Sequence, residues 1–214
     1  MRYRKADEPK ATARGALRSR MVAKLSGASL RQLGYWHRTR LIKARALPGG
    51  PGQPRLYSWE DYMKVRAAKK LQHEGLTTQR IRAHIAFLDH EFPDWPYRDV
   101  REFAHRAMIQ VSEPREAYVT ARPGLPAVFP DLAFGVLSEL ASEGALGQMR
   151  DFEAFVAMDP AVLSGNPVVR GTRIETRFVF SLVERNFPEP TIRDIYHLTT
   201  EQVSKALEFE RLAA

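Results

Sequence analysis

One long stretch near the N-terminus carries positive charge only. From Pro9 through Trp59 the sequence contains no Asp or Glu, yet it contains eleven Lys and Arg residues. Soluble surfaces normally mix charges of both signs, so solubility alone does not explain such a run. A surface of one sign attracts polyanions and steers them toward itself. The acid-free run therefore predicts contact with nucleic acid.

The two halves of the chain differ in charge. Residues 1–90 hold 20 basic and 6 acidic residues, a net charge of +14, whereas residues 91–214 hold 13 basic and 19 acidic residues. This asymmetry predicts a nucleic-acid module joined to a part with another task. We expect four segments: a basic disordered arm (1–14), a DNA-binding domain (15–90), a linker or dimerisation segment (91–150) and a C-terminal helical module (151–214).

Several classes of protein are disfavoured by composition. The chain has no Cys, so disulfides and thiolate chemistry are excluded, and its six His residues show no metal-ligand spacing. Neither a nucleophile elbow nor a phosphate loop occurs. No apolar stretch approaches 18 residues, and the first residues lack the apolar core of a secretory signal. We expect a cytoplasmic protein that is no enzyme and uses no metal or cofactor.

Residues 16–39 have the pattern of a helix-turn-helix. Apolar residues at helical spacing predict a first helix over 16–25, which Gly27 can end in the left-handed conformation. Ser29 is a plausible N-cap for a second helix reaching about residue 39. Arg31, Tyr35 and Arg38 then share one face, with Gln32 beside them, while Leu30, Leu33 and His37 share another. Arg and Gln are the side chains that read guanine and adenine edges in the major groove.

A small wing is expected to follow the helix-turn-helix. Residues 41–45 are typical of a strand, residues 48–54 of a loop, and residues 55–57 would return antiparallel to contact the phosphate backbone. The glycine-rich loop could instead suggest a phosphate cradle, but the Lys-Ser/Thr pair and the helix of such a motif are missing. Ser58 then caps a third helix that Gly75 ends, and Thr77 or Thr78 caps a fourth.

The order of these elements resembles the DNA-binding domain of MerR-type regulators over about residues 15–90. The matching residues are Ser29, Leu33, Tyr35-Trp36, Leu41-Ile42, Arg55, Tyr57, Ser58-Trp-Glu-Asp61 and Gly75-Leu76. The chain departs from the family at Gly34, where an Arg is common, and at Arg40, where a Gly is usual. The resemblance implies that Tyr35, Arg55 and Tyr57 touch phosphates and that Arg31 and Gln32 face bases. Ser29, Arg38, Arg40 and Lys43 complete the expected DNA-binding residues.

The rest of the chain carries weaker local signals. Residues 108–111 and 117–120 could be strands, and residues 132–140 have a helical pattern. Val168-Val169 is a short β-type run that ends in a turn at Gly171. Three helices should follow: one from about residue 175, one around residues 192–195, and one that Thr199 and Gln202 begin with a capping box.

A second resemblance covers about residues 152–210. Asp159-Pro160, Gly165-Asn-Pro-Val and Arg170-Gly-Thr-Arg-Ile174 resemble a small domain of bacterial antitoxins whose partners are PIN-like ribonuclease toxins. Together with the MerR-like head, this segment resembles a subgroup of VapB-type antitoxins. We expect Arg170, Arg173, Val203 and Leu207 to bind the partner. The alternative is that the two arginines are solvated or pair with local carboxylates.

These signals predict a mainly α protein with a small β wing: a MerR-like winged helix-turn-helix domain plus a C-terminal three-helix module. The leading functional hypothesis is a dimeric antitoxin that binds double-stranded operator DNA, represses its own operon and neutralises a PIN-like ribonuclease toxin. The first alternative is a one-component regulator whose C-terminal part senses a small ligand. The second is a passive nucleoid-binding protein.

Overall fold

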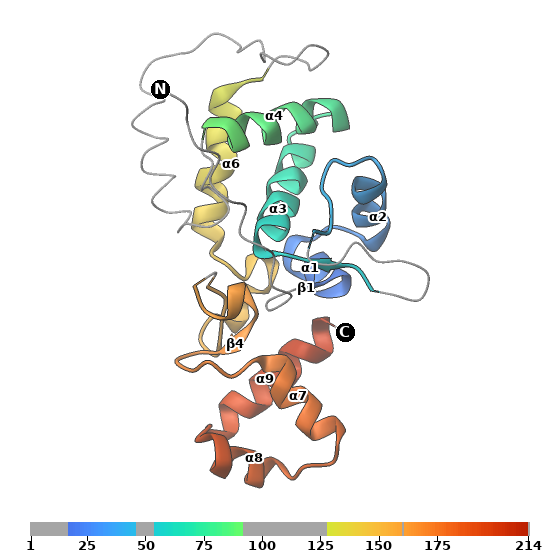
Figure 1. Ribbon diagram of the computed structural model, residues 1–214. Helices are drawn as coiled ribbons and strands as arrows, with labels where there is room; N and C mark the ends of the chain where they lie inside the picture. The colour runs from blue at the N-terminus through green and yellow to red at the C-terminus, as the bar shows by residue number, and fades with distance from the viewer. Residues whose placement is uncertain (1–16, 46–53, 92–127, 160, 214) are drawn as a thin grey trace, which may run out of the picture.

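The computed structural model describes residues 17–45, 54–91, 128–159 and 161–213, and they form a mainly helical protein (Figure 1). The α-helices are α1 Ser19–Ser26, α2 Leu30–Arg38, α3 Trp59–His73, α4 Thr78–Glu91, α6 Pro130–Glu143, α7 Thr176–Glu184, α8 Glu189–Tyr196 and α9 Thr200–Ala213. Two 3-10 helices are η1 Gly147–Phe152 and η2 Leu163–Gly165. Two antiparallel pairs of strands are β1 Leu17–Arg18 with β2 Leu56–Tyr57, and β3 Val156–Ala157 with β4 Val168–Val169. The predicted mainly α class is confirmed; the predicted N-terminal arm and the strands at 108–111 and 117–120 lie outside the described residues.

The helix ends of the N-terminal head, the part of the chain before residue 91, follow the local signals in its sequence. Gly27 ends α1 with a φ of 70° in the left-handed region. The Ser29 hydroxyl accepts a hydrogen bond from the amide of Gln32, and the Gln32 side chain accepts one from the amide of Ser29. Ser58 and Asp61 form the same reciprocal capping box at the start of α3. Each box satisfies backbone donors that the first turn of a helix leaves unpaired, and both predicted N-caps are confirmed.

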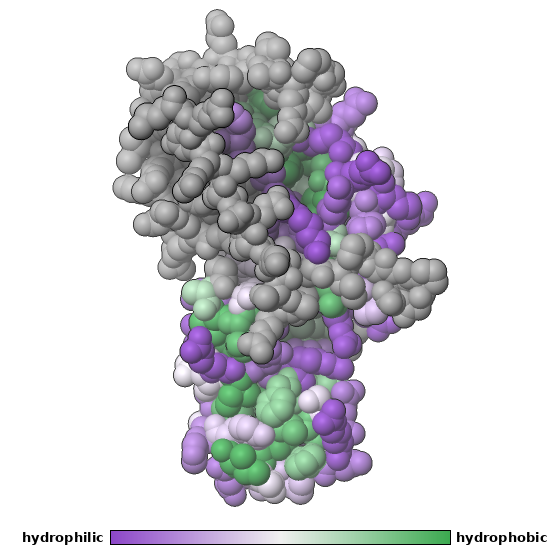
Figure 2. Space-filling model, viewed as in Figure 1, coloured by the Kyte–Doolittle hydropathy of each residue, from purple (hydrophilic) through white to green (hydrophobic). Residues whose placement is uncertain are grey.

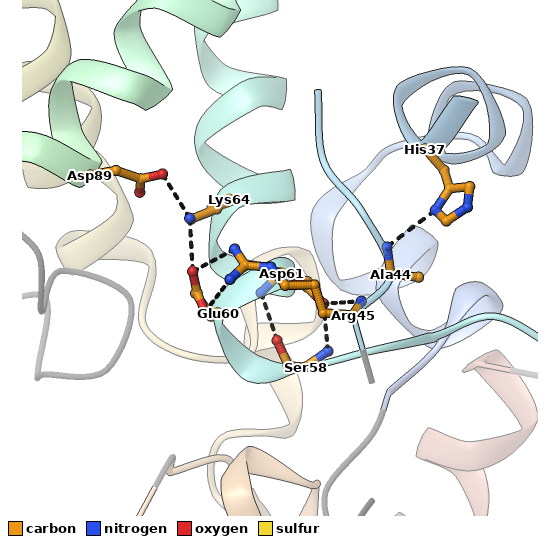
Figure 3. Close-up of polar contacts among 8 residues, drawn as sticks. All are labelled: His37, Ala44, Arg45, Ser58, Glu60, Asp61, Lys64 and Asp89. Carbon is orange, nitrogen blue, oxygen red and sulfur yellow. Dashed lines mark hydrogen bonds and ion pairs between the residues drawn. The ribbon is translucent and has the colours of Figure 1, made fainter. Parts of the chain in front are cut away.

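The strand predicted over residues 41–45 does not form. Its backbone donors bond elsewhere: the amide of Ala44 donates to Nδ1 of His37 at 3.2 Å, and the amide of Arg45 donates to the carboxylate of Asp61 at 2.8 Å (Figure 3). The predicted returning strand does exist, as β2, but it pairs with Leu17–Arg18 instead. Because two side chains already hold its amides, the segment after α2 has no reason to enter a β ladder.

The core of the head extends beyond residue 90. Helix α6 packs against α3 and α4, and its apolar residues Val136, Leu137 and Leu140 are buried in the same cluster as the head residues Trp36, Trp59 and Leu71. The hydroxyl of Tyr62 donates to the carbonyl of Ala145 at 2.7 Å, and the guanidinium of Arg66 donates to the carbonyl of Gly144 at 2.6 Å. Residues 128–158 therefore complete the core of the head, while the domain boundaries drawn from the sequence stay a prediction.

Helices α7, α8 and α9 group at the other end of the molecule around a second, smaller core (Figure 1). This core consists of Val169, Val179, Leu182, Ile192, Leu198, Val203, Ala206 and Leu207. Thr199 and Gln202 form the predicted capping box at the start of α9. The end of α9 leaves this core, since Phe209 and Ala213 are buried in the cluster of the head. One helix thus belongs to both parts.

The Arg170–Ile174 signature folds into a tight turn. Gly171 has a φ of 79°, which favours glycine. The Thr172 hydroxyl donates to the carbonyl of Val169 at 2.8 Å and accepts from the amide of Ile174 at 3.0 Å. The guanidinium of Arg170 donates to the carbonyls of Glu153 and Val156. Most of the signature therefore shapes the chain between β4 and α7.

Candidate nucleic-acid interface

Helix α2 buries one face and exposes the face expected to meet DNA. Leu33 and Trp36 are 2% and 3% exposed and anchor the helix in the head. Arg31 and Arg38 are exposed, and Tyr35 between them is 44% exposed. Leu30 was expected to share the buried face with Leu33, but its side chain is 51% exposed. The helix presents two guanidinium groups and a phenol at spacings that a major groove accommodates.

Gln32 is less available than the sequence suggests. Its side-chain oxygen accepts from the amide of Ser29 at 2.8 Å, and its side-chain nitrogen donates to Oε1 of Gln72 at 2.8 Å. Pairing both ends of the amide with adenine would require breaking both bonds. Ser29 likewise uses its hydroxyl as the N-cap of α2. In this structure both side chains position the helix.

Gly34 brings two cations together. A methyl group on Gly34 would lie 3.6 Å from a guanidinium nitrogen of Arg38 and 3.8 Å from one of Arg55. Two guanidinium groups, one from α2 and one from the segment before β2, therefore lie close to Gly34. MerR-type domains commonly carry an Arg at this position, and here two neighbouring arginines place positive charge beside it.

A basic hollow of about 570 Å³ adjoins the end of α2. It is lined by His37, Arg38, Arg40, Lys43, Ala44 and Arg45. Arg40 has a φ of 57°, the left-handed region that glycine adopts most easily, which agrees with the Gly usual at this position in MerR-type domains. The guanidinium of Arg82 supports the turn by donating to the carbonyls of Thr39 at 2.7 Å and Arg40 at 3.2 Å. Sequence reasoning missed Arg82, because no local pattern links α4 to this turn.

Acidic residues of α3 pair with Arg45, one of the residues that line the hollow. The Arg45 guanidinium contacts Glu60 at 2.6 Å and Asp61 at 3.1 Å, and the Lys64 ammonium bridges Glu60 and Asp89 at 2.8 Å each (Figure 3). Burial raises the pKa of Asp61, while hydrogen bonds from the backbone of Arg45 and Ser58 pull it down. The guanidinium of Arg45 is thus paired with carboxylates of its own chain. The other cations that line the hollow, Arg38, Arg40 and Lys43, are exposed.

Tyr57 does not reach the surface. Its side chain is 1% exposed, and burial raises the pKa of its hydroxyl. The expectation that Tyr57 touches a DNA phosphate is therefore wrong, because β2 turns the ring into the core of the head. Arg55, two residues earlier, is partly exposed.

The structure also corrects the expected partner-binding residues. Val203 and Leu207 are 0% and 3% exposed inside the core of the C-terminal module, so they offer no surface to a partner. The guanidinium of Arg170 donates hydrogen bonds to two carbonyl groups of its own chain. Arg173 is exposed. Of the four, Arg173 alone remains a candidate contact.

An apolar surface that sequence reasoning missed lies on α7, α8 and the segment between them. Phe178, Phe187 and Ile195 are 40%, 48% and 59% exposed. Phe178 packs edge-on against Tyr196, with ring centroids 5.3 Å apart. Figure 2 shows apolar side chains gathered on this end of the molecule. We call Phe178, Phe187 and Ile195 the apolar face; helical spacing alone did not separate them from core residues.

No group of three or more His, Asp or Glu side chains in the described ranges could hold a metal ion. Within the same ranges, no helix is both long and apolar enough to cross a bilayer.

Comparison with known proteins supports the head and the C-terminal module separately. Residues 17–88 match the model of the MerR HTH family of regulatory proteins, and residues 156–209 match a family described as a protein of unknown function, DUF433. An uncharacterized HTH-type transcriptional regulator of Mycobacterium bovis, Mb1861, and another of Mycobacterium tuberculosis, Rv1830, are each 32% identical over 68 residues. That match spans 31% of this chain and 30% of each regulator.

A solved structure also resembles the chain, at low similarity. The crystal structure of Rv2018 from Mycobacterium tuberculosis has 16% sequence identity and a TM-score of 0.49, covering 91% of this chain and 99% of that one. A similarity this low assigns no function. The two family matches are the informative result: the chain carries a MerR-family helix-turn-helix domain at residues 17–88 and a DUF433 segment at residues 156–209.

Proposed function

We propose that this protein is a transcriptional regulator that reads double-stranded DNA with α2. The observation that carries the proposal is the exposed Arg31, Tyr35 and Arg38 face of α2 directly beside the basic hollow. Arg31 lies in the first turn of α2, where a recognition helix contacts base edges. Arg38, Arg40, Lys43 and Arg55 surround the other end of the helix and suit phosphate contacts. Because these contacts are mainly electrostatic, the affinity for DNA should fall strongly as the salt concentration rises.

DNA binding is expected to require a homodimer. One helix-turn-helix reads few base pairs, and dimers of such domains place half-sites about one helical turn, roughly 10 base pairs, or a multiple apart. Helix α4 and the segment that follows it are the candidates for the dimer contact. Sedimentation with and without a selected duplex measures the stoichiometry. Binding of one isolated half-site by a monomer would contradict the proposal.

Selection from random duplexes tests sequence-specific binding. We expect the full chain to enrich a repeated half-site and to bind it at least about a thousandfold more tightly than random DNA. Arg31→Ala should weaken the selected duplex, while Arg185→Ala, which removes an exposed arginine beyond α7, should not. Equal enrichment of all sequences would instead favour a passive nucleoid-binding protein. Equal loss in both variants would indicate that only net charge matters.

We further propose that the regulator is an antitoxin that represses its own operon and binds a PIN-like ribonuclease through its C-terminal module. The resemblance of residues 152–210 to antitoxins supports this, and so does the apolar face. Solvent-exposed aromatic and aliphatic side chains that cluster on one surface are typical of protein interfaces. Arg173 could add a charged contact at the edge.

Co-expression with a PIN-like ribonuclease encoded next to the gene tests the antitoxin proposal. We expect a stable complex and rescue of growth. Ile195→Glu should abolish both, because it places a charge in the apolar face, whereas Leu212→Glu is the matched control at a 48% exposed position at the end of α9. Absence of a complex, or equal loss in both variants, would contradict the assigned role of this face.

A further inference from the structure

A cleft of about 610 Å³ separates the DNA-binding head from the C-terminal module. The head contributes residues 17–21 of β1 and α1, Leu30 of α2, and Arg55. The module contributes Glu175, side chains of α7 that include Phe180, and Glu210 of α9. Its volume is within the usual range for sites that hold small organic molecules, and such sites often lie between domains.

The charge inside the cleft is positive once internal pairs are considered. Four arginines and three glutamates line the cleft. Glu184 contacts Arg177 at 3.6 Å, and Glu175 accepts a hydrogen bond from Asn166 at 3.2 Å that leaves its charge in place. Arg18 and Arg55, in contrast, have no carboxylate within ion-pair distance among the described residues. These two cations lie at the same end of the first sheet, because Arg18 of β1 pairs with Leu56, the residue that follows Arg55. An anion entering the cleft would meet unpaired positive charge.

The lining of the cleft includes one buried acid, Glu210. Glu210 is 5% exposed, and its Oε1 accepts a hydrogen bond from the Thr176 hydroxyl at 2.6 Å. Burial raises the pKa of Glu210, and the hydrogen bond from Thr176 and the charges of Arg177 and Arg18 oppose that effect.

The walls of the cleft are also apolar. Leu30 is 51% exposed at the first position of α2. Phe180 stands across from the head on α7, and the guanidinium of Arg177 lies 5.1 Å from its ring centroid. An exposed leucine and a phenyl ring in one cleft favour a ligand with an apolar body.

We propose that this cleft binds a small organic anion with an apolar body about the size of one or two aromatic rings. Arg18 and Arg55 would hold its carboxylate or other acidic group, and Leu30 and Phe180 would contact its body. The site itself stands independently of the proposed DNA binding, because its test involves no DNA. Its use as a regulatory site rests on that proposed function, since Arg55 borders both the cleft and the basic surface around α2.

Titration calorimetry on the full chain tests the proposal with two probes of the same shape and opposite charge. We expect 1-naphthoate to bind and 1-naphthylmethylammonium to bind at least about tenfold more weakly, because the net charge of the residues that line the cleft is positive. Absence of naphthoate binding, or equal binding of the two probes, would overturn the proposal.

Two pairs of variants locate the bound probe. Leu30→Ser should weaken naphthoate binding about fivefold through lost apolar contact, whereas Ile195→Ser, at an exposed position on the apolar face, should leave it unchanged. Arg18→Gln should weaken it as well, while Lys24→Gln, on the exposed side of α1, should not. Equal effects of a variant and its control would place the probe outside the cleft and overturn the assignment. Circular dichroism of each variant confirms that the fold is intact.

Discussion

Nδ1 of His37 accepts a hydrogen bond from the backbone amide of Ala44 at 3.2 Å. This contact ties the last turn of α2 to the segment that carries Arg40 and Lys43, so one imidazole holds the shape of the basic hollow. The bond needs an unprotonated Nδ1. Burial lowers the pKa of His37, and the charge of Arg55 lowers it further, while Asp61 opposes them. The site therefore depends on a neutral histidine.

We expect acid to loosen the head through His37. Its folded pKa is below the unfolded value of about 6.5, so the stability from this contact is complete above that value. Stability falls as the pH drops through 6.5 toward the folded pKa. His37→Gln retains an acceptor that does not titrate, and should therefore flatten the decline of the urea midpoint between pH 7 and pH 5. His73→Gln, at a side chain 90% exposed, is the control and should leave the wild-type slope. Identical slopes in all three proteins would contradict the role of His37.

Arg31 and Arg55 should contribute to DNA binding in different ways. Arg31→Ala is expected to cost about 1–3 kcal/mol on the selected site and to relax its sequence preference, because Arg31 is placed to face bases. Arg55→Ala should weaken random and selected DNA alike and reduce the salt slope by about 1, because it is placed to meet phosphate. Fluorescence anisotropy over a salt series measures both. A uniform loss in Arg31→Ala would show that the reading face of α2 is assigned wrongly.

Gly34→Ala should stabilise the protein. Gly34 lies inside α2, where glycine costs about 1 kcal/mol relative to alanine. The added methyl group would meet only the side-chain ends of Arg38 and Arg55, at ordinary contact distances of 3.6 and 3.8 Å. Urea unfolding should show a gain of about 0.5–1 kcal/mol. A loss of stability would mean that the two guanidinium groups cannot move aside.

Gly165 should tolerate a side chain far less well than Gly171. Both have positive φ, 85° and 79°, so both substitutions carry a similar backbone cost of about 1 kcal/mol. A methyl group on Gly165 would collide with the indole ring of Trp59, whereas nothing lies within 4 Å of one on Gly171. Gly165→Ala should therefore be less stable than Gly171→Ala by about 1–3 kcal/mol. Equal stabilities in urea would show that the C-terminal module is not packed on the head at Trp59.

An organic anion in the cleft should weaken DNA binding. Arg55 lines the cleft and also lies beside Gly34 near α2, so the anion and a DNA phosphate compete for it. We expect 1-naphthoate at saturation to lower the affinity for random duplex DNA, and Leu30→Ser to need about fivefold more of it for the same effect. Benzamidinium, a cation, is the control for ionic strength. An unchanged affinity at saturating naphthoate would separate the cleft from DNA binding.

Local signals in the sequence predicted much of the head. The N-caps at Ser29 and Ser58, the left-handed Gly27 and the exposed Arg31, Tyr35 and Arg38 face depend on residues within a few positions of one another. Capping and helical periodicity are short-range effects, so they can be recognised without knowing the fold. The same holds for the Thr199 capping box and for the turn at Gly171.

Contacts between distant residues overturned the other expectations. The strand predicted at 41–45 failed because Asp61 and His37 hold its amides, and β2 found its partner at Leu17–Arg18. Tyr57 was expected to contact phosphate and Val203 to contact a partner. Both are instead buried in cores built from several elements. Burial is a property of the whole packing, which local spacing does not contain.

The sequence by itself determined that this protein has a basic helix-turn-helix head, a mainly helical fold and a compact C-terminal module, because charge, capping residues and periodicity act locally. Only the tertiary structure decided which cations face outward, where the basic hollow lies and how the two parts meet. Gly165 against Trp59, and α9 shared between two cores, place the C-terminal module directly on the head. Those relationships join residues that lie more than a hundred positions apart in the chain, and packing alone brings them together.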